Sequence, residues 1–256
     1  MLKKIVYKIG SKFYNTFSVG SVASRPMQGL NKKLYFEKDQ YIGFAMRSVI
    51  THEERVKNRI KKYIKPGDTV FDVGSNIGQF AMFFSELVGE KGKVSCYEPH
   101  YNNFTFLTFN KLKNRCDNVI ITNKGVGAEV QKKEFFKDKM TGGRTSSFVK
   151  EYIKGNQKND SEVMSITTLD EEIKQHGIPN FIKIDVEGFE HEVLKGLTKL
   201  PDNTKFMIEV RSETRKPIFD YFHTKGFKCF YLDVEEIEEI TRSEDIFQFA
   251  NLLFMK

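Results

Sequence analysis

The chain has 256 residues, enough for one large α/β domain with or without a short extension, and its 39% hydrophobic residues and 24 Phe argue against global disorder. No apolar run approaches the roughly 18 residues that a membrane span requires, and Lys8 and Lys12 interrupt any signal-type apolar region. Three cysteines without a CxxC pair argue against a disulfide framework and a cysteine-based zinc site, so we expect a reducing, cytoplasmic location.

The net charge of +7 is concentrated toward the N-terminus. Residues 1–65 hold 15 Lys and Arg against 4 Asp and Glu, whereas the remainder holds 26 against 30. We therefore predict a basic N-terminal extension or cap over residues 1–50 and a main domain over residues 51–256. The extension could contact an anionic membrane surface, nucleic acid or a charged glycan, although a solvated helical cap is the simpler explanation.

The apolar pattern predicts secondary structure in chain order. A strand or hairpin is expected around residues 41–46, followed by a helix that Thr51 and Glu54 open as a capping box and that Pro66-Gly67 ends. Beyond it, strands are expected at 69–73, 93–97, 119–122, 181–185, 205–210, 227–231 and 251–255, with helices near 78–88, 101–114, 187–196 and 215–225. Such alternation is typical of a doubly wound, mostly parallel α/β sheet.

Residues 132–149 and 163–167 depart from this rhythm and resemble extra strands. Two polar stretches, 140–147 and 150–160, are expected to be loops. Long polar insertions in α/β enzymes often serve as lids or substrate loops, and an indifferent surface role explains them nearly as well.

Two glycines follow the first main strand, in the segment Asp72-Val73-Gly74-Ser75-Asn76-Ile77-Gly78. The order strand, tight turn, helix lets backbone amides approach a nucleoside-bearing cofactor closely. Asn76 either assists the turn through its amide or tolerates a left-handed backbone. Asp72, Gly74, Ser75, Asn76 and Gly78 are therefore candidate cofactor contacts, and the alternative is an ordinary βα loop.

An acid, Glu98, ends the next strand and is followed by Pro99. A carboxylate there is well placed to accept hydrogen bonds from both ribose hydroxyls and to disfavour a 2′-phosphate. Pro99 prevents the strand from continuing. Together with the glycine turn, Glu98 and Pro99 favour a nucleoside-binding site.

A second motif lies at residues 181–191, where Lys183 and Asp185 share one face of a predicted central strand. A lysine there is costly unless a carboxylate pairs with it, so a structural Lys183–Asp185 or Lys183–Glu209 pair is a serious interpretation. Ligands of doubly wound sheets bind at the carboxyl ends of strands, however, where Asp72, Glu98, Asp185 and Glu209 should all emerge. Four acids at such ends favour a functional site.

Glu187 and His191 are four residues apart and would share a face if both were helical, which would let Glu187 orient His191 as a general base. A surface histidine in the first helical turn is the alternative. Lys195 stands where a zinc-protease motif needs its second histidine, which argues against that motif. Asp185, Glu187 and Glu209 could bind a divalent cation, but the spacing does not require one, and we predict no metal.

These motifs in combination resemble the FkbM-type family of S-adenosylmethionine-dependent methyltransferases. The similarity rests on DVGSNIG at 72–78, YEP at 97–99, TLDE at 168–171, IKIDVEGFE at 182–190, Ile208-Glu209-Val210 and Asn251 to Phe254. It covers about residues 50–256, so residues 51–256 would form the methyltransferase domain.

The resemblance implies a class I methyltransferase fold, a Rossmann-like sheet of seven strands with the last one antiparallel. It implies S-adenosyl-L-methionine as cofactor and O-methylation of a hydroxyl on a sugar, glycan or related small molecule. Gly74, Asn76 and Gly78 would contact the methionine moiety, Glu98 the ribose and Asn123 the adenine. Asp185 and Glu187 would lie beside the transferred methyl, and Asp185, Glu187 and His191, in that order, are the candidate bases.

Three alternatives stay open. A nicotinamide-dependent dehydrogenase would usually have a Gly-x-Gly-x-x-Gly turn, whereas this turn reads Gly-x-x-x-Gly. A nucleic-acid methyltransferase would explain the basic extension, but the chain lacks an Asp/Asn-Pro-Pro-Tyr motif and a recognisable nucleic-acid module. A non-catalytic cofactor-binding scaffold is the third. The acceptor and the oligomeric state are not predicted.

Overall fold

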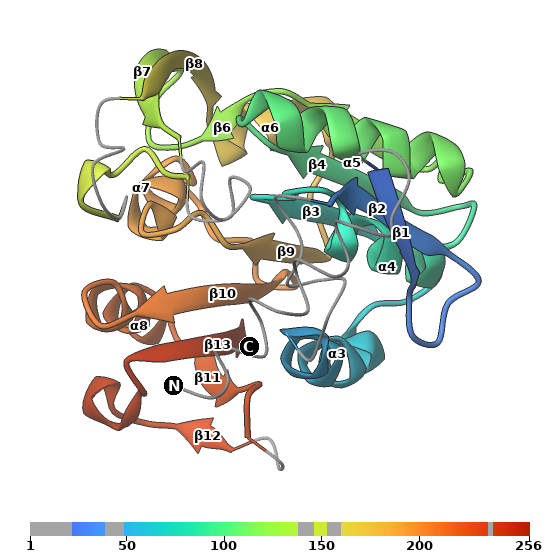
Figure 1. The fold of residues 1–256 in the computed structure, drawn as a ribbon. Helices are drawn as coiled ribbons and strands as arrows, with labels where there is room; N and C mark the ends of the chain where they lie inside the picture. Colours follow the sequence, from blue (N-terminus) through green and yellow to red (C-terminus); the bar gives the residue numbers. More distant parts are fainter. Residues whose placement is uncertain (1–21, 39–48, 138–145, 153–159, 235–237) are drawn as a thin grey trace, which may run out of the picture.

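A computed structural model describes residues 22–38, 49–137, 146–152, 160–234 and 238–256. Within them, eight strands form one sheet, and Figure 1 labels its strands from β12 to β4. Their order is β12 (Glu239–Ile240), β11 (Lys228–Tyr231), β13 (Phe249–Met255), β10 (Lys205–Arg211), β9 (Phe181–Ile184), β3 (Thr69–Val73), β4 (Lys93–Tyr97) and β5 (Val119–Thr122).

The five strands from β10 to β5 are mutually parallel, whereas β13 is antiparallel to both of its neighbours, β10 and β11. The doubly wound, mostly parallel α/β class and the antiparallel last strand are thus confirmed. The expected seven strands are all present, and the two-residue strand β12 adds an eighth to the sheet at its edge.

The sheet is buried on both faces because its central strands are apolar at nearly every position. In β3, Val70 belongs to one apolar core cluster, while Phe71 and Val73 belong to the other. In β9, Phe181 likewise lies opposite Ile182 and Ile184. This period of two requires helices on both faces of the sheet.

Six helices supply those layers within the described residues. Apolar residues of α3 (Val49–Ile60), α4 (Gln79–Val88) and α5 (Tyr101–Lys113) belong to the cluster of Val70, whereas those of α6 (Leu169–His176), α7 (Glu190–Lys195) and α8 (Arg215–His223) belong to that of Phe71. No helix among the described residues is both long and apolar enough to cross a membrane.

Two smaller elements flank the main sheet. The hairpin of β1 (Val22–Pro26) and β2 (Lys33–Glu37) contacts α5. There the side chain of Asn110 accepts a hydrogen bond of 2.7 Å from the amide of Tyr35 and donates one of 2.9 Å to its carbonyl oxygen. The second is a three-stranded sheet of β6 (Gly125–Val126), β8 (Ser161–Thr167) and β7 (Gln131–Phe136). It lies near α7 at the upper left of Figure 1, and Lys133 of β7 lies over the ring of Phe189.

Several local expectations need correction. Helix α3 begins at Val49, so Thr51 lies inside the helix and not at its cap. Helix α6 was not expected, because its eight residues are mostly polar. The extra strands are β7 and β8, and β6 is too short to leave a pattern. The expected hairpin at 41–46 and most of residues 1–50 lie outside the described residues, so the boundary at residue 50 and a membrane contact stay predictions.

Candidate functional site

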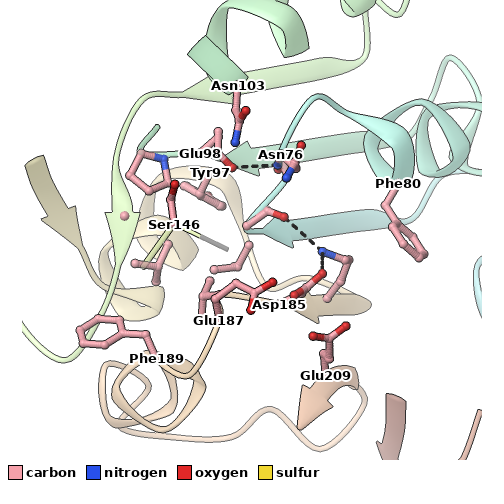
Figure 2. A pocket seen from close by; sticks show the side chains of 18 of the residues that line it. Asn76, Phe80, Tyr97, Glu98, Asn103, Ser146, Asp185, Glu187, Phe189 and Glu209 are labelled. Atoms are coloured by element: carbon pink, nitrogen blue, oxygen red, sulfur yellow. Dashed lines mark hydrogen bonds and ion pairs between the residues drawn. The ribbon is translucent and has the colours of Figure 1, made fainter. Parts of the chain in front are cut away.

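A cavity opens at the carboxyl ends of the parallel strands, the edge where doubly wound sheets bind ligands. Its walls include residues at or after the ends of β3, β4 and β9, together with Glu209 from β10. Figure 2 shows Asn76, Glu98, Asp185, Glu187 and Glu209 around this space. The structure thus brings most of the predicted site residues together.

The glycine turn after β3 contains three residues in left-handed backbone conformations, which side chains disfavour. Gly74 has φ +78°, and a Cβ atom there would lie 1.9 Å from the carbonyl oxygen of Asp185, so no larger residue fits without movement. Asn76 has φ +51°, and its Oδ1 accepts a 2.7 Å hydrogen bond from the Ile77 amide. Both suggested roles of Asn76 are therefore present. Gly78, at φ +95°, begins helix α4.

Glu98 holds this turn against the end of β4. Its Oε2 accepts a hydrogen bond of 2.8 Å from the amide of Asn76, drawn in Figure 2, and its Oε1 accepts one of 2.8 Å from the amide of His100. The side chain is 5% exposed, and burial raises its pKa to about 7 although the backbone amides favour the ionised form. A carboxylate oxygen can accept two hydrogen bonds, so Glu98 retains acceptor capacity toward the cavity.

Lys183 lies at the floor of the cavity, between two acids. Its Nζ is 3.3 Å from Asp185 Oδ2, 3.4 Å from Asp72 Oδ1 and 3.2 Å from the carbonyl oxygen of Gly74. Burial disfavours the ammonium, but Asp185 and Asp72 outweigh it and hold the pKa of Lys183 above its ordinary value. The expected Lys183–Asp185 pair is present, and Asp72 is a partner that the sequence did not suggest.

Three carboxylates, those of Asp185, Glu187 and Glu209, approach within 4.8 Å of one another. Arg211 bonds to Glu187 and lies 3.4 Å from Glu209, while Lys183 pairs with Asp185. The side chains of Lys183 and Arg211 therefore already balance much of the negative charge of the three acids. The cluster could hold a cation by spacing alone, but its existing pairs give no reason to invoke one.

Three phenylalanine rings also line the cavity, and sequence reasoning missed them. Phe135 and Phe148 lie 4.8 Å apart, and Phe148 lies 5.2 Å from Phe189, measured between ring centroids. Phe135 and Phe148 come from the inserted segment between β5 and α6. Of the three, only Phe189 lies within a motif quoted above, IKIDVEGFE at 182–190, which was the one available signal.

The predicted site residues divide into two groups. Gly74, Ser75, Asn76, Glu98, Pro99, Asp185 and Glu187 line the cavity. Asp72, Gly78, Asn123 and His191 are not among the described residues that line it. Asp72 is fully buried beneath the floor, and Gly78 caps α4. Asn123 instead donates hydrogen bonds of 2.8 and 3.0 Å to the carbonyls of Glu98 and Pro99.

His191 lies apart from the cavity, beside a separate hollow lined by Glu192 and Glu213. The expected helical pairing of Glu187 with His191 is wrong, because α7 begins only at Glu190 and Glu187 has φ +53°. A left-handed residue three positions before the helix cannot share its face. Glu187 therefore does not orient His191 in this structure.

Comparison with protein families gives a direct result. The model of the "Methyltransferase FkbM domain" matches residues 72–241. The chain belongs to the FkbM methyltransferase family. The matched segment contains the glycine turn, Glu98, the Lys183–Asp185 pair and Glu209, so this FkbM domain includes nearly the whole cavity.

Two curated relatives resemble this FkbM chain. It is 30% identical over 162 residues to the hexuronic acid methyltransferase AglP of Haloferax volcanii, covering 61% of each chain. It is 27% identical over 182 residues to the 31-O-demethyl-FK506 methyltransferase FkbM of Streptomyces tacrolimicus, covering 60% of this chain and 68% of that one. The chain thus spans less than two thirds of the length of AglP.

The solved structure of PH0793 from Pyrococcus horikoshii shares the fold, with a TM-score of 0.51 at 14% identity over all of this chain and 85% of the other. Membership of the FkbM family implies S-adenosylmethionine, and the cavity fits that molecule chemically. A buried carboxylate suits ribose hydroxyls, aromatic rings suit a purine, and the acids suit a cationic methionine moiety.

Proposed function

We propose that this protein is an S-adenosylmethionine-dependent O-methyltransferase whose acceptor is a hydroxyl group of a sugar, glycan or related small molecule. The observation that carries the proposal is the arrangement of the acids: Glu98 lies on one wall of the cavity, while Asp185 and Glu187 lie on another. One wall suits a nucleoside and the other suits an acceptor hydroxyl. The names of the two relatives, a hexuronic acid methyltransferase and a macrolide methyltransferase, support the same class of acceptor.

On this proposal, Gly74, Ser75, Asn76 and Glu98 hold the cofactor, and the aromatic residues Phe135, Phe148 and Phe189 line its apolar side. Bound S-adenosylmethionine supplies a methyl group on a positively charged sulfur. Asn123 acts indirectly, by fixing the carbonyls of Glu98 and Pro99.

An alcohol is a weak nucleophile at neutral pH, so removal of its proton assists attack. Asp185 is the base that the geometry favours, because its side chain is about one-third exposed to the cavity while Lys183 fixes Oδ2 at 3.3 Å. Its other oxygen remains to accept the acceptor proton. His191, beside the separate hollow, is the least favoured of the three candidates.

Glu187 and Glu209 are suited to binding further acceptor hydroxyls. Burial, together with the charges of Asp185 and Glu187, raises the pKa of Glu209 well above its ordinary value. Carboxyl oxygens accept hydrogen bonds from the hydroxyls of a polyol, and Glu209 offers them at the cavity wall. No metal or covalent intermediate is required by this assignment.

The test has two stages. Calorimetry of cofactor-stripped protein with S-adenosylhomocysteine should show binding, and its absence would refute the proposal. Transfer of a radioactive methyl group from S-adenosylmethionine is then measured on a glucuronic acid oligosaccharide, a neutral hexose oligosaccharide, a macrolide and total RNA. Label on a hydroxyl of the first three classes supports the proposal, and label confined to RNA would favour the nucleic-acid alternative.

A further inference from the structure

The segment between β9 and α7, residues 185–189, shapes the acceptor wall of the cavity. It carries two consecutive left-handed residues, Glu187 at φ +53° and Gly188 at φ +91°. A left-handed backbone is routine for glycine but costs about 1 kcal/mol or more for a residue with a side chain, and it persists only where neighbours fix it. Something in the structure must therefore hold Glu187 in place.

The carboxylate of Glu190 closes this segment on itself. Its Oε1 accepts hydrogen bonds from the amides of Val186, at 3.3 Å, and Gly188, at 2.9 Å. These amides belong to the Asp185–Val186 and Glu187–Gly188 peptide units, so one oxygen fixes the backbone both before and after the strained residue. Two further contacts fix Glu187 itself, since Ser147 donates a 2.8 Å hydrogen bond to its carbonyl and Arg211 bonds to its carboxylate.

Burying the carboxyl group of Glu190 lowers the stability of the fold unless that group has a further role. It is 2% exposed, and its Oε2 has no hydrogen-bond partner among the residues described. Burial raises its pKa to about 7, although the amides of Gly188 and Val186 favour the ionised form. A buried acid with one unsatisfied oxygen destabilises a fold, and an apolar side chain of similar size would avoid that cost.

The segment that Glu190 fixes also adjoins the cofactor side of the cavity. The carbonyl oxygen of Asp185 lies so close to Gly74 that a Cβ there would approach it to 1.9 Å. A shift of residues 185–188 therefore moves the support of the glycine turn as well as the two acids. Both walls of the cavity depend on this one loop.

We propose that Glu190 is a positioning residue, whose carboxylate fixes the backbone of residues 186–188 so that Asp185 and Glu187 face the cavity. The proposal rests on the proposed methyl transfer for its purpose, although its geometry can be tested without an acceptor. Glu190 does not line the cavity among the residues described, so it acts through the loop and not on the substrate.

The decisive comparison is between two conservative variants. Glu190→Gln retains the length of the side chain and one acceptor oxygen, whereas Glu190→Asp retains the charge but shortens the reach to the two amides. Glu192→Gln is the control, since Glu192 belongs to the same helix but is more exposed and pairs with Lys195. Each variant is assayed for thermal unfolding, hydrogen exchange of the Gly188 amide by NMR, and affinity for S-adenosylhomocysteine.

If Glu190 positions the loop, the shorter side chain of Glu190→Asp no longer reaches the two amides. Exchange of the Gly188 amide should then be roughly tenfold faster and S-adenosylhomocysteine binding roughly tenfold weaker, the equivalent of one lost buried hydrogen bond. Glu190→Gln and the control should stay within about threefold of wild type. The proposal is overturned if Glu190→Asp keeps the exchange rate and affinity of the wild type. It is also overturned if both Glu190 variants lose affinity and amide protection equally. If wild type does not bind S-adenosylhomocysteine, the proposed function fails, while Gly188 exchange still decides the role of Glu190.

Discussion

Lys183, at the floor of the cavity, forms an ion pair with Asp72 beneath it, with Nζ 3.4 Å from Oδ1 and both side chains almost fully buried. They lie on adjacent strands, where Lys183 of β9 is paired in register with Asp72 of β3. Burial raises the pKa of Asp72 even though Lys183 lowers it. Two central strands are thus joined by charges that have little access to water.

Removing the cation should therefore destabilise the fold. Lys183→Met leaves Asp72 buried without its partner, so we expect a loss of about 3–5 kcal/mol in the free energy of unfolding, measured by urea denaturation. Lys195→Met is the control, because Lys195 forms an exposed pair with Glu192 and should change stability by less than about 1 kcal/mol. Adding Asp72→Asn to Lys183→Met should recover part of the loss. A Lys183→Met variant as stable as the control would contradict this.

Gly74 should be far less replaceable than other glycines with the same backbone. Gly74→Ala places a Cβ 1.9 Å from the carbonyl of Asp185, whereas Gly226→Ala, at a similar φ of +77°, meets no atom within 4 Å. The control pays only the backbone strain, about 1 kcal/mol. We expect Gly74→Ala to lose more stability than Gly226→Ala and to weaken S-adenosylhomocysteine binding at least tenfold, roughly one lost hydrogen bond to a charged group. Equal effects of the two variants on binding would show that the close approach does not matter.

The pKa of Glu98, raised to about 7 by burial, predicts that cofactor binding depends on pH. Ribose hydroxyls donate hydrogen bonds, so they bind the ionised carboxylate better and lower its pKa. Affinity for S-adenosylhomocysteine should therefore rise between pH 6 and pH 8, and binding at pH 7 should release a fraction of a proton. Calorimetry in buffers of different ionisation enthalpy measures that proton directly.

Glu98→Gln separates this effect from that of Glu190, whose pKa is also raised to about 7. The variant should bind S-adenosylhomocysteine more weakly and lose most of the pH dependence, because the amide does not titrate. Glu190→Gln should retain the pH dependence. Proton release that survives in Glu98→Gln would remove Glu98 from the ribose site.

Much of the fold could be predicted because its signals are local. The run before Asp72, the turn with Gly74 and Gly78, and Glu98 lie within thirty residues, and parallel strands carry such motifs to one edge of the sheet. The family resemblance then supplied the antiparallel last strand.

The rest depends on contacts that no local pattern encodes. Phe135 and Phe148 belong to the segment that contains the three-stranded sheet of β6, β8 and β7, which lies near α7. In the sequence they are at least 40 residues from Phe189, although the rings pack together. The expected helix at 187–196 was too long because Glu190 binds the amides of Val186 and Gly188 and ends the left-handed turn just before α7. His191 was misplaced for the same reason.

Loss of the Asp185 carboxylate should lower the rate of methyl transfer without weakening cofactor binding. Asp185→Asn keeps the size of the side chain but removes the proposed base, so turnover should fall by roughly 10²–10⁴-fold, the range for loss of general-base catalysis. Affinity for S-adenosylhomocysteine should change little. Single-turnover methyl transfer, to whichever acceptor the proposed transfer assay identifies, measures turnover, and calorimetry measures the affinity. Unchanged turnover would remove Asp185 from the list of bases.

Glu187 offers a test of whether backbone strain is held for function. Glu187→Gln and Glu187→Gly both lose the ion pair with Arg211, but only glycine relieves the left-handed conformation at φ +53°. We therefore expect Glu187→Gly to be about 1 kcal/mol more stable than Glu187→Gln in urea denaturation, because the strain is absent. Both variants should show reduced methyl transfer, since both lack the carboxylate that faces the cavity. If Glu187→Gly is the less stable of the two, the left-handed backbone at residue 187 is not strained, and the neighbouring contacts are not needed to maintain it.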